Sequence, residues 1–337
     1  MKNTTRLQYN RYLENIAKLN GVQDATKNFS VEPTIQQKLE NRIQESSAFL
    51  MSIGLQLVDE MVGQKLGLGV SNTIAGRTNT DNNDRVPQHL GDLTGQGYHC
   101  KFTEFDTAIK YSKLDQWAKF KDFQTRIRDV IVRQQALDRI MIGFNGTSAA
   151  AETDRAANPL LQDVNIGWLE KWRTDAPERV MDEVAEASGE VTVGAGAGTN
   201  YKNLDALVFD AVNNFIATWH QERTDMVVVL GRQLLNDKYF PLINKDNAPT
   251  EHKALDLIVS EKRLGGLQAV RAPFVPAGTM LITPLENLAI YVQDGKRRRN
   301  IEENSKRSQI ENYESSNEDY VVEDYSAGCL IENIVVN

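Results

Sequence analysis

Histidine and cysteine are the residue types best suited to bind a metal ion, and their spacing in this chain argues against a metal site. The histidines are His89, His99, His220 and His252, and the cysteines are Cys100 and Cys329. The sequence contains no H-x-x-x-H pattern and no C-x-x-C pair. His99 and Cys100 are adjacent, so in a strand they would point to opposite faces. We therefore expect no metal ion and two free thiols.

The glycine run "VGAGAGTN" (residues 193–200) is a stretch that could bind phosphate, because closely spaced glycines let backbone amides approach an anion. No Lys-Ser/Thr pair follows it, and its spacing is not G-x-G-x-x-G. The sequence also lacks the G-x-S-x-G elbow that anchors many Ser-His-Asp hydrolases. We interpret the run as a linker and expect no catalytic residue and no cofactor.

The most charged stretch covers residues 293–325, where four consecutive cations precede a series of carboxylates. The cations are Lys296, Arg297, Arg298 and Arg299, and the carboxylates singled out are Glu311, Glu314, Glu318, Asp319, Glu323 and Asp324. Three interpretations are open for this stretch. It could contact a nucleic-acid backbone, form one half of a protein–protein contact, or be a solvated turn.

The bulk composition restricts these interpretations. A net charge of −8 argues against broad attraction to nucleic acid or anionic membranes. The length of 337 residues suits two sub-domains, and 41% hydrophobic with 25% charged residues is a globular composition. The N-terminus lacks the apolar segment of a signal peptide, and no stretch approaches eighteen apolar residues. We expect a soluble protein from a reducing compartment, without a membrane partner.

The elements that position these residues begin with two amphipathic helices. Apolar residues recur at helical spacing over residues 9–19, and a second helix is predicted from Pro33, which suits a first turn. Alternation then predicts strands at 53–57 and 66–70 and a return strand over 98–111. The alternation changes phase after Phe102, which predicts a bulge. The polar segment between these strands is long enough to form an outreaching hairpin tip.

A long helix is the strongest pattern in the second quarter of the chain. It is predicted from Asp115, as N-cap, over nearly thirty residues, a length of about 40 Å. A further helix is expected around residues 168–184, with a break or new turn at Pro177. After the glycine run the pattern becomes α/β, with a helix at 204–219 and a buried strand at 226–231.

Longer stretches of the sequence then point to a family. The chain resembles the major capsid proteins of peduovirus-type tailed bacteriophages, which have contractile tails. The matching stretches occur in order over nearly the whole chain, and they include "NFSVEPTIQQKL", "LDQWAKFKDFQTRIRDVI", "GFNGTSAAAETDRAANPLLQDVNIGWLEKWR", "VVVLGRQLLNDKYFPLINK", "TMLITPLENLAIY" and "IEENSKRSQIENYESSNEDYVVEDYSAGCL".

The resemblance implies an α+β chain with the tailed-bacteriophage major capsid fold, which encapsulin shells share. Four parts are expected. Residues 1–50 would be an N-terminal arm that docks scaffolding protein, and residues 51–112 an extended hairpin loop lying over a neighbouring subunit. Residues 113–198 and 285–337 would form the peripheral domain with its long spine helix. Residues 199–284 would form the axial domain, around the five- and six-fold axes.

The function implied is structural and not enzymatic. The chain would self-assemble into hexamers and pentamers of an icosahedral head, with T=7 expected, that encloses double-stranded DNA. The implied partners are other copies, an internal scaffolding protein and maturation protease, a portal protein, packaged DNA held by weak non-specific contact, and a satellite-encoded size-determining factor. The expected location is the virion, and the host cytoplasm during assembly. The alternatives are an encapsulin-like compartment or a nucleotide-binding enzyme.

Two site predictions follow from the resemblance. Phe29, Ser30 and Val31 match the region where a maturation protease trims the arm in this family. Shell subunits meet through heterologous contacts, in which one edge complements a different edge. We therefore expect the cations at 296–299 of one copy to pair with the carboxylates between 311 and 324 of another.

Overall fold

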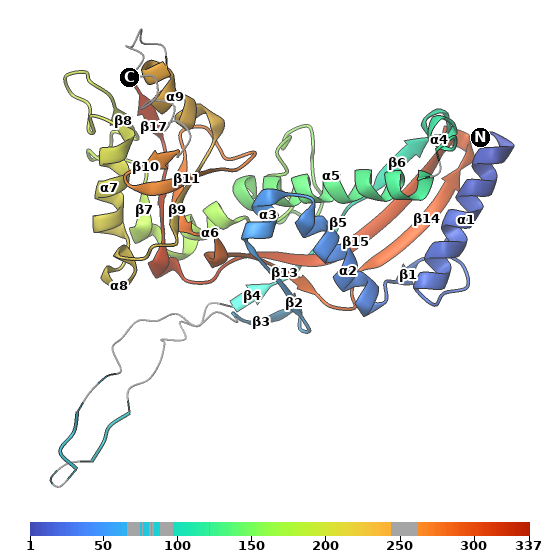
Figure 1. Ribbon diagram of the computed structural model, residues 1–337, viewed down its shortest axis with the longest axis horizontal. Helices are drawn as coiled ribbons and strands as arrows, with labels where there is room; N and C mark the ends of the chain where they lie inside the picture. The colour runs from blue at the N-terminus through green and yellow to red at the C-terminus, as the bar shows by residue number, and fades with distance from the viewer. Residues whose placement is uncertain are drawn as a thin grey trace, which may run out of the picture. The chain divides into compact units, whose positions relative to one another are not determined.

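The computed structural model describes residues 1–65, 97–120, 122–243 and 262–337, and a few positions between 75 and 87 (Figure 1). Most of the predicted hairpin tip, the predicted strand at 66–70, and His89 and His252 lie outside the described residues. The chain divides into two compact units. Unit 1 comprises Met1–Gly63, Tyr98–Trp168 and Ala289–Tyr320, and unit 2 comprises Gln64–Gly97, Leu169–Leu288 and Val321–Asn337.

A seven-stranded sheet forms the base of unit 1. Its order is β1-β14-β15-β13-β2, and β5 and β6 both pair with β15. The bounds are β1 (Phe29–Ser30), β2 (Gly54–Val58), β5 (Lys101–Glu104), β6 (Thr107–Lys110), β13 (Leu288–Gln293), β14 (Arg298–Asn304) and β15 (Gln309–Val322). Two shorter strands, β3 (Val62–Gln64) and β4 (Gly97–His99), form a separate ladder. The charged stretch of the sequence therefore supplies β14 and the fourteen-residue β15.

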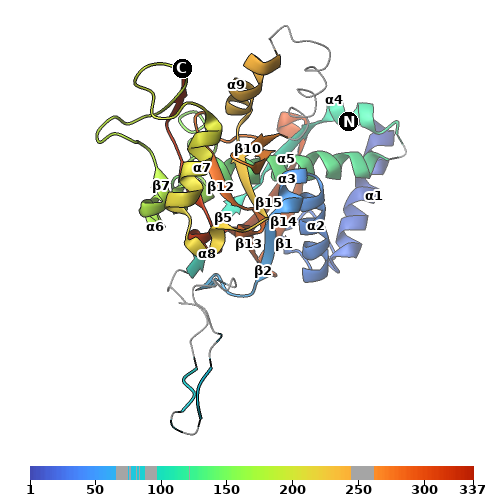
Figure 2. The same cartoon turned by 60° about the vertical axis from the view of Figure 1, so that its left-hand side comes forward.

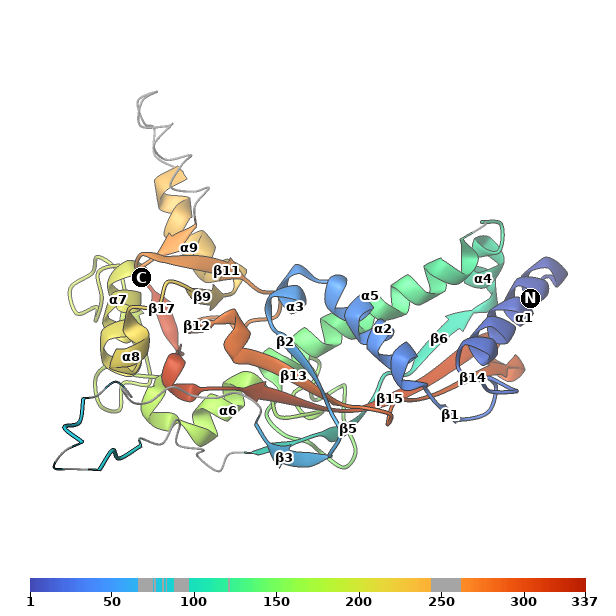
Figure 3. The same cartoon turned by 60° about the horizontal axis from the view of Figure 1, so that its bottom comes forward.

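Five helices accompany this sheet: α1 (Asn3–Leu19), α2 (Pro33–Glu45), α3 (Ala48–Ser52), α4 (Tyr111–Trp117) and α5 (Phe123–Asn145). Figure 3 shows α2 alongside α5, and the two helices are in contact. Phe123, Ile127 and Ile131 recur every four residues on α5, so one face of the helix packs on the sheet. Helices α1 and α2 confirm the predicted N-terminal helices, and Pro33 is the first residue of α2.

The first thirty-one residues contribute half of a hydrophobic cluster that we call the arm cluster. From this segment come Tyr9, Tyr12, Ile16, Ala25, Phe29 and Val31, and from the rest of unit 1 come Leu114, Phe123, Ile127, Ile131, Ile301 and Ile310. All of these side chains are buried. The N-terminal segment therefore docks on its own chain, on α4, α5, β14 and β15.

The predicted long helix is divided in two. Helix α4 ends at Trp117 and α5 begins at Phe123 after Asp122. Asp115 is therefore not the N-cap of the long helix but lies inside α4. Its Oδ1 accepts hydrogen bonds from the Lys2 backbone N–H (2.9 Å) and Thr5 Oγ1 (2.5 Å), so it caps the start of α1 across 110 residues of sequence.

The predicted change of phase in residues 98–111 is present, but the predicted bulge is wrong. Tyr98 and Cys100 are buried, and then Thr103 and Phe105, with Phe102 exposed. The switch falls where β4 passes into β5. Along β15 the register does not shift, because Glu104 opposes Ser315 and Thr107 opposes Asn312 with equal numbers of residues between.

Unit 2 is built on a six-stranded sheet in the order β10-β11-β9-β12-β16-β7, with β17 and β8 as a separate pair. The strands are β7 (Val180–Met181), β8 (Val191–Val193), β9 (Met226–Leu230), β10 (Arg263–Leu264), β11 (Leu267–Arg271), β12 (Met280–Pro284), β16 (Cys329–Ile331) and β17 (Ile334–Val336). Every residue of β9 is buried, as predicted. The Cys100 and Cys329 side chains are buried in different units and form no disulfide with each other.

Among the described residues, the helices of unit 2 are α6 (Trp168–Asp175), α7 (Leu204–Phe215), α8 (Thr218–Gln221) and α9 (Arg232–Ile243). Figure 2 shows α7 beside the sheet, and Leu204, Leu207 and Val208 share its hydrophobic core with Val228 and Leu230. A new turn begins at Pro177, as predicted, but the predicted helix does not continue to residue 184, because α6 ends at Asp175 and Val180–Met181 form β7. The predicted helix at 204–219 is interrupted, because Ile216 and Ala217 adopt extended conformations between α7 and α8.

Candidate functional site

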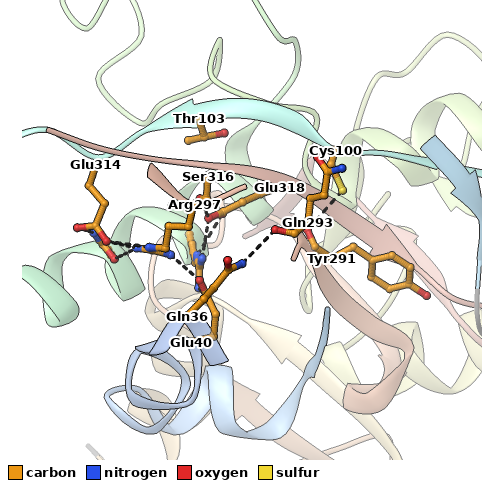
Figure 4. A network of polar contacts seen from close by, with 12 residues as sticks. Gln36, Glu40, Cys100, Thr103, Tyr291, Gln293, Arg297, Glu314, Ser316 and Glu318 are labelled. Carbon is orange, nitrogen blue, oxygen red and sulfur yellow. Dashed lines mark hydrogen bonds and ion pairs between the residues drawn. The ribbon is translucent and has the colours of Figure 1, made fainter. Parts of the chain in front are cut away.

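Five charged side chains in unit 1 form a buried network, which we call the buried charge network. They are Glu40 from α2, Arg139 from α5, Arg297 from the turn before β14, and Glu314 and Glu318 from β15. The exposed fraction of each side chain is at most 2%. Figure 4 shows Glu40 and Gln36 pointing from α2 toward Arg297 and Gln293.

Arg139 links two carboxylates that come from opposite ends of the chain. Its Nε and Nη2 donate to the two oxygens of Glu318 at 3.1 and 2.6 Å, and its Nη1 donates to Glu40 Oε2 at 2.6 Å. The bond to Glu318 is bidentate, the geometry that best matches the guanidinium fork to a carboxylate. All of the Arg139 nitrogens therefore have partners.

Arg297 occupies the equivalent position between Glu40 and Glu314. Its Nε donates to Glu314 Oε1 at 2.7 Å, its Nη1 to Glu40 Oε1 at 2.5 Å, and its Nη2 to Gln135 Oε1 at 2.8 Å. Gln135 in turn donates to Glu314 Oε2 at 3.1 Å. Glu40 thus bridges the two arginines with one oxygen each.

Neutral side chains complete the network. Ser316 Oγ donates to Glu318 Oε1, and Asn165 Nδ2 donates to the Glu318 carbonyl at 2.9 Å. Gln36 Nε2 donates to the Gln293 carbonyl at 3.0 Å, and its Oε1 accepts the Gly295 N–H at 3.0 Å. Buried polar groups are costly when left unpaired, so these bonds matter as much as the ion pairs.

The local sequence explains how these residues meet. On β15, Glu314, Ser316 and Glu318 follow the two-residue period of a strand and so share one face. On the helices the period is four, which places Gln36 beside Glu40 and Gln135 beside Arg139. Each polar series therefore forms a short row, and the three rows converge in the interior of unit 1.

The arginines keep the carboxylates charged. Burial by itself raises the pKa of Glu40, but Arg139 and Arg297 outweigh it and the pKa is lowered. At Glu314 burial also acts to raise the pKa, but Arg297 and Arg299 outweigh it and lower the pKa to about 2. Glu40 and Glu314 are therefore ionised at neutral pH, beside the two guanidinium groups.

A second set of polar contacts holds α1 on the same unit. Arg6 forms a bidentate ion pair with Glu303, whose Oε1 accepts from Arg6 Nη2 at 2.7 Å. Tyr111 OH donates to the same Glu303 oxygen at 2.6 Å. Arg299 Nη2 donates to Tyr12 OH at 3.0 Å. These contacts surround the arm cluster and are partly exposed, unlike the buried charge network.

These contacts hold the helices and strands of unit 1 together, and comparison with known proteins agrees with a structural role. The family model "Phage major capsid protein, P2 family" matches residues 8–334. The chain belongs to this family. The predicted resemblance to phage major capsid proteins is confirmed, and with it the structural role in the virion. The P2-family capsid proteins are not a class of enzymes.

Individual relatives cover the whole chain. "Capsid proteins" of Escherichia phage P2 is 51% identical over 342 residues, which is 100% of this chain and 96% of that protein. The "Major capsid protein" of Serratia phage KSP20 is 41% identical over 339 residues, 99% of this chain and 97% of that protein.

A solved structure shows the same fold. A chain in the satellite phage P4 procapsid, a structure that includes the size determination (Sid) protein, superimposes with a TM-score of 0.84. That chain has 49% sequence identity to this one, and the match covers 100% of this chain and 99% of the other. The predicted mixed helix and sheet fold of a tailed-phage major capsid protein is therefore confirmed.

The basic run of this P2-family capsid protein alternates between surface and interior. Lys296 and Arg298 are exposed, Arg297 is buried in the network and Arg299 is half-buried. The run therefore does not act as one cationic patch. Arg298 and Arg299 lie in β14, where successive side chains point to opposite faces, whereas Lys296 and Arg297 precede the strand.

The predicted carboxylates divide in the same way. Glu314 and Glu318 belong to the buried charge network, whereas Glu311 is half-buried and accepts hydrogen bonds from Gln309 and Tyr313. Three others lie further along the chain: Asp319 is buried, and Glu323 and Asp324 are half-buried. Asp319 accepts the His99 backbone N–H at 2.9 Å, and Asp324 accepts the Ser326 N–H at 2.8 Å.

This placement corrects part of the ion-pairing prediction. Arg297, Glu314 and Glu318 are paired within one chain, and a side chain without exposed surface cannot reach a neighbouring copy. Their partners Glu40, Gln135 and Arg139 were not identified from the sequence. Pairing between copies stays a prediction for the other residues of the set, which are Lys296, Arg298, Arg299, Glu311, Asp319, Glu323 and Asp324.

The predicted processing region lies in an ordered strand. Phe29 and Ser30 form β1 at the edge of the sheet, opposite Arg299 and Arg298. The Val31 N–H donates to the Arg297 carbonyl at 2.8 Å, and the Phe29 and Val31 side chains are buried in the arm cluster.

The other candidates show no chemistry of their own. Thr199 Oγ1 closes the glycine run by donating to the Gly194 and Gly196 carbonyls, and the next helix, α7, is capped by Asn203, which accepts the Ala206 N–H at 2.8 Å. A helix N-terminus capped in this way has less capacity to bind phosphate.

Among the described residues, no three metal-ligating side chains come together. Within the same ranges, no helix has the length and apolar character needed to cross a membrane.

The network predicts a large effect of one amide substitution. We expect Glu40→Gln to lower the free energy of unfolding by roughly 3–5 kcal/mol, since it leaves two buried guanidinium groups short of charge. Denaturant unfolding followed by tryptophan fluorescence would measure it. Glu45→Gln on the same helix is the matched control, because its pair with Arg42 is 3.4 Å long and exposed, and we expect a change below about 1 kcal/mol. Equal effects of the two substitutions would contradict the role assigned to Glu40.

The network also predicts a pH dependence. The pKa of Glu314 is about 2 in the folded chain and 4.5 as its ordinary value, so its stabilising contribution is present above pH 4.5 and is lost as the pH falls toward 2. Glu314→Gln should therefore be less stable than wild type by about 3 kcal/mol at pH 7, and the difference should shrink toward pH 2. The exposed Glu302→Gln variant serves as control. A difference that stays constant across this range would rule out the lowered pKa.

Proposed function

We propose that this chain assembles into hexamers and pentamers that build the closed icosahedral head of a contractile-tailed phage, and that the head encloses double-stranded DNA. The observation that carries the proposal is the full-length likeness to a chain of the P4 procapsid, at 49% identity and a TM-score of 0.84. The expected head is T=7. The family match favours a phage head over an encapsulin-like compartment, and the capped helix after the glycine run counts against a nucleotide-binding enzyme.

The partners proposed for assembly are an internal scaffolding protein with a maturation protease, a portal protein and a satellite-encoded size-determining factor. The last is supported by the size determination protein present in the P4 procapsid structure. Assembly would take place in the host cytoplasm before the head becomes part of the virion.

The proposed division of labour follows the sequence. Residues 1–50 are the arm, 51–112 the extended loop, 113–198 with 285–337 the peripheral domain and 199–284 the axial domain. The compact units divide at other points, since unit 1 takes in the arm and unit 2 takes in 169–198 and 321–337.

We also propose that the arm is trimmed at Phe29, Ser30 or Val31 during maturation. Proteases bind their substrates as accessible extended chain, whereas this segment is hydrogen-bonded in β1 and its apolar side chains are buried. Cleavage therefore requires the arm to leave the arm cluster first. Residues after the cut remain fixed, because α2 is held by Glu40.

Assembly of the purified chain tests the proposed function. We expect the full chain, expressed with a candidate scaffolding protein, to form uniform closed shells in negative-stain electron microscopy.

The exposed cations are expected to help set the contacts between copies, so Lys296→Glu/Arg298→Glu should reduce the yield of closed shells. Lys306→Glu, another exposed cation, is the control. Soluble monomers with and without scaffold would overturn the capsid proposal. Normal shells from the charge-reversed variant would contradict only the proposed role of Lys296 and Arg298 in contacts between copies.

Weakening the arm cluster should speed cleavage of β1. Ile16 is buried in the cluster, so we expect Ile16→Ala to destabilise the docked arm by about 2–5 kcal/mol, which favours local opening. Limited proteolysis with peptide mapping should show at least tenfold faster cleavage at residues 29–31. Leu19 is on the same helix and 62% exposed, and Leu19→Ala should leave the rate unchanged. Identical rates in both variants would mean that α1 does not protect the site.

A further inference from the structure

A surface groove in unit 1 has not been used by the function so far. It has a volume of about 560 Å³ and lies where α2, the end of α4 and α5 meet. Four arginines line it, Arg42 from α2 and Arg126, Arg128 and Arg133 from α5, and two carboxylates, Glu45 and Asp129, accompany them. We call this site the arginine groove. It is separate from the buried charge network and from the basic run of β14.

The arginines of the groove are available for another partner. Arg42 pairs with Glu45 at 3.4 Å, Arg128 with Asp129 at 2.8 Å, and Arg126 with Asp122 at 3.0 Å. The side chains in these pairs are 42–64% exposed, and exposed pairs of this kind contribute little. Arg133 is exposed and makes no ion pair with any described residue. The cations can thus exchange their partners at small cost.

The spacing of the cations is regular. Arg126 and Arg133 are seven residues apart on α5, so they project from the same face, separated by about 10 Å along the helix axis. The two helices that carry the groove are fixed against each other below it, because Glu40 of α2 is ion-paired with Arg139 of α5 at 2.6 Å. The guanidinium groups therefore line a preformed surface.

We propose that the arginine groove binds the phosphate backbone of the enclosed nucleic acid, an inference that rests on the proposed function only in that the head contains DNA. Guanidinium groups match the tetrahedral phosphate with paired N–H donors. A separation of about 10 Å equals roughly three base-pair steps of a duplex, so the two same-face arginines can contact one strand. No base is read, and the contact is independent of sequence.

The contact is weak and sensitive to salt. A net charge of −8 opposes the approach of a polyanion, and the groove carries two carboxylates of its own. Binding then comes from a few arginine–phosphate contacts, each of which releases counterions. Such a surface holds DNA against the protein without fixing it at one position.

The experiment measures binding of the full, unassembled chain to a fluorescently labelled 20-base-pair duplex, by anisotropy over a series of salt concentrations. We expect Arg126→Gln/Arg133→Gln to lower the slope of log affinity against log salt by about 2, roughly 0.9 for each lost phosphate contact. Arg11→Gln/Lys306→Gln removes two exposed cations outside the groove and should change the slope by less than about 0.5. Equal effects of the two double variants would overturn the proposal.

A second probe separates nucleic acid from an acidic protein partner. Labelled poly-glutamate should bind more weakly than the duplex, and binding of poly-glutamate that equals that of DNA and falls equally in the groove variant would also overturn the proposal. Denaturation midpoints equal to wild type establish that both variants are folded. Because the groove variant should still form closed shells in electron microscopy, a failure here is distinguishable from a failure of the capsid proposal.

Discussion

The structure of unit 1 depends on one constraint, that an arginine without exposed surface must have every nitrogen paired. Arg139 and Arg297 meet it by drawing together carboxylates from α2 and β15, which are more than 250 residues apart in sequence. Alternative placements of α2 would leave the charges of Arg139 and Arg297 without Glu40 in a low-dielectric interior, at a cost of several kcal/mol. Buried ion pairs of this kind add little to the stability of the native fold, but they make competing placements of α2 much less stable. A single well-defined fold suits a subunit that must be made in many identical copies.

Two segments of the proposed N-terminal arm are held in place by different kinds of interaction. Residues before Val31 rest on apolar burial in the arm cluster and on partly exposed contacts such as Arg6–Glu303. Residues after it are anchored through Glu40, whose carboxylate has no exposed alternative partner. The first kind of attachment can be released by local opening, whereas the second requires the interior of unit 1 to be disrupted. The change from the first kind of attachment to the second therefore falls at strand β1, which contains the proposed processing site.

Much of the fold could be predicted because it is encoded locally. Helices α1 and α2 and strand β9 follow from periodicity and from Pro33, and each lies close to its predicted position. The role of Asp115 could not be predicted, because Asp115 is a good local N-cap and its actual partners, Lys2 and Thr5, are distant in sequence. Here a tertiary contact overrides a local preference.

The buried charge network could not be predicted from the sequence, also because its contacts join residues that are distant along the chain. Charged residues are usually exposed, so the basic run reads as a surface patch. A usable signal was present, since Glu314, Ser316 and Glu318 alternate along a strand and Gln135 and Arg139 lie one helical turn apart on an amphipathic helix. Polar rows on faces that should be apolar indicate a buried network, but they do not reveal which rows meet.

The sharing of Glu40 between two arginines has a consequence for how relatives of this chain diverge. Replacing any one member leaves the others uncompensated, so single substitutions are disfavoured while joint replacement by apolar residues of similar volume is tolerated. The five positions should therefore change as a linked set during evolution, and drift independently of the exposed cations on the neighbouring strand. Correlated substitutions at these five positions would then identify the residues that anchor α2 in a sequence alignment, even where overall identity is low.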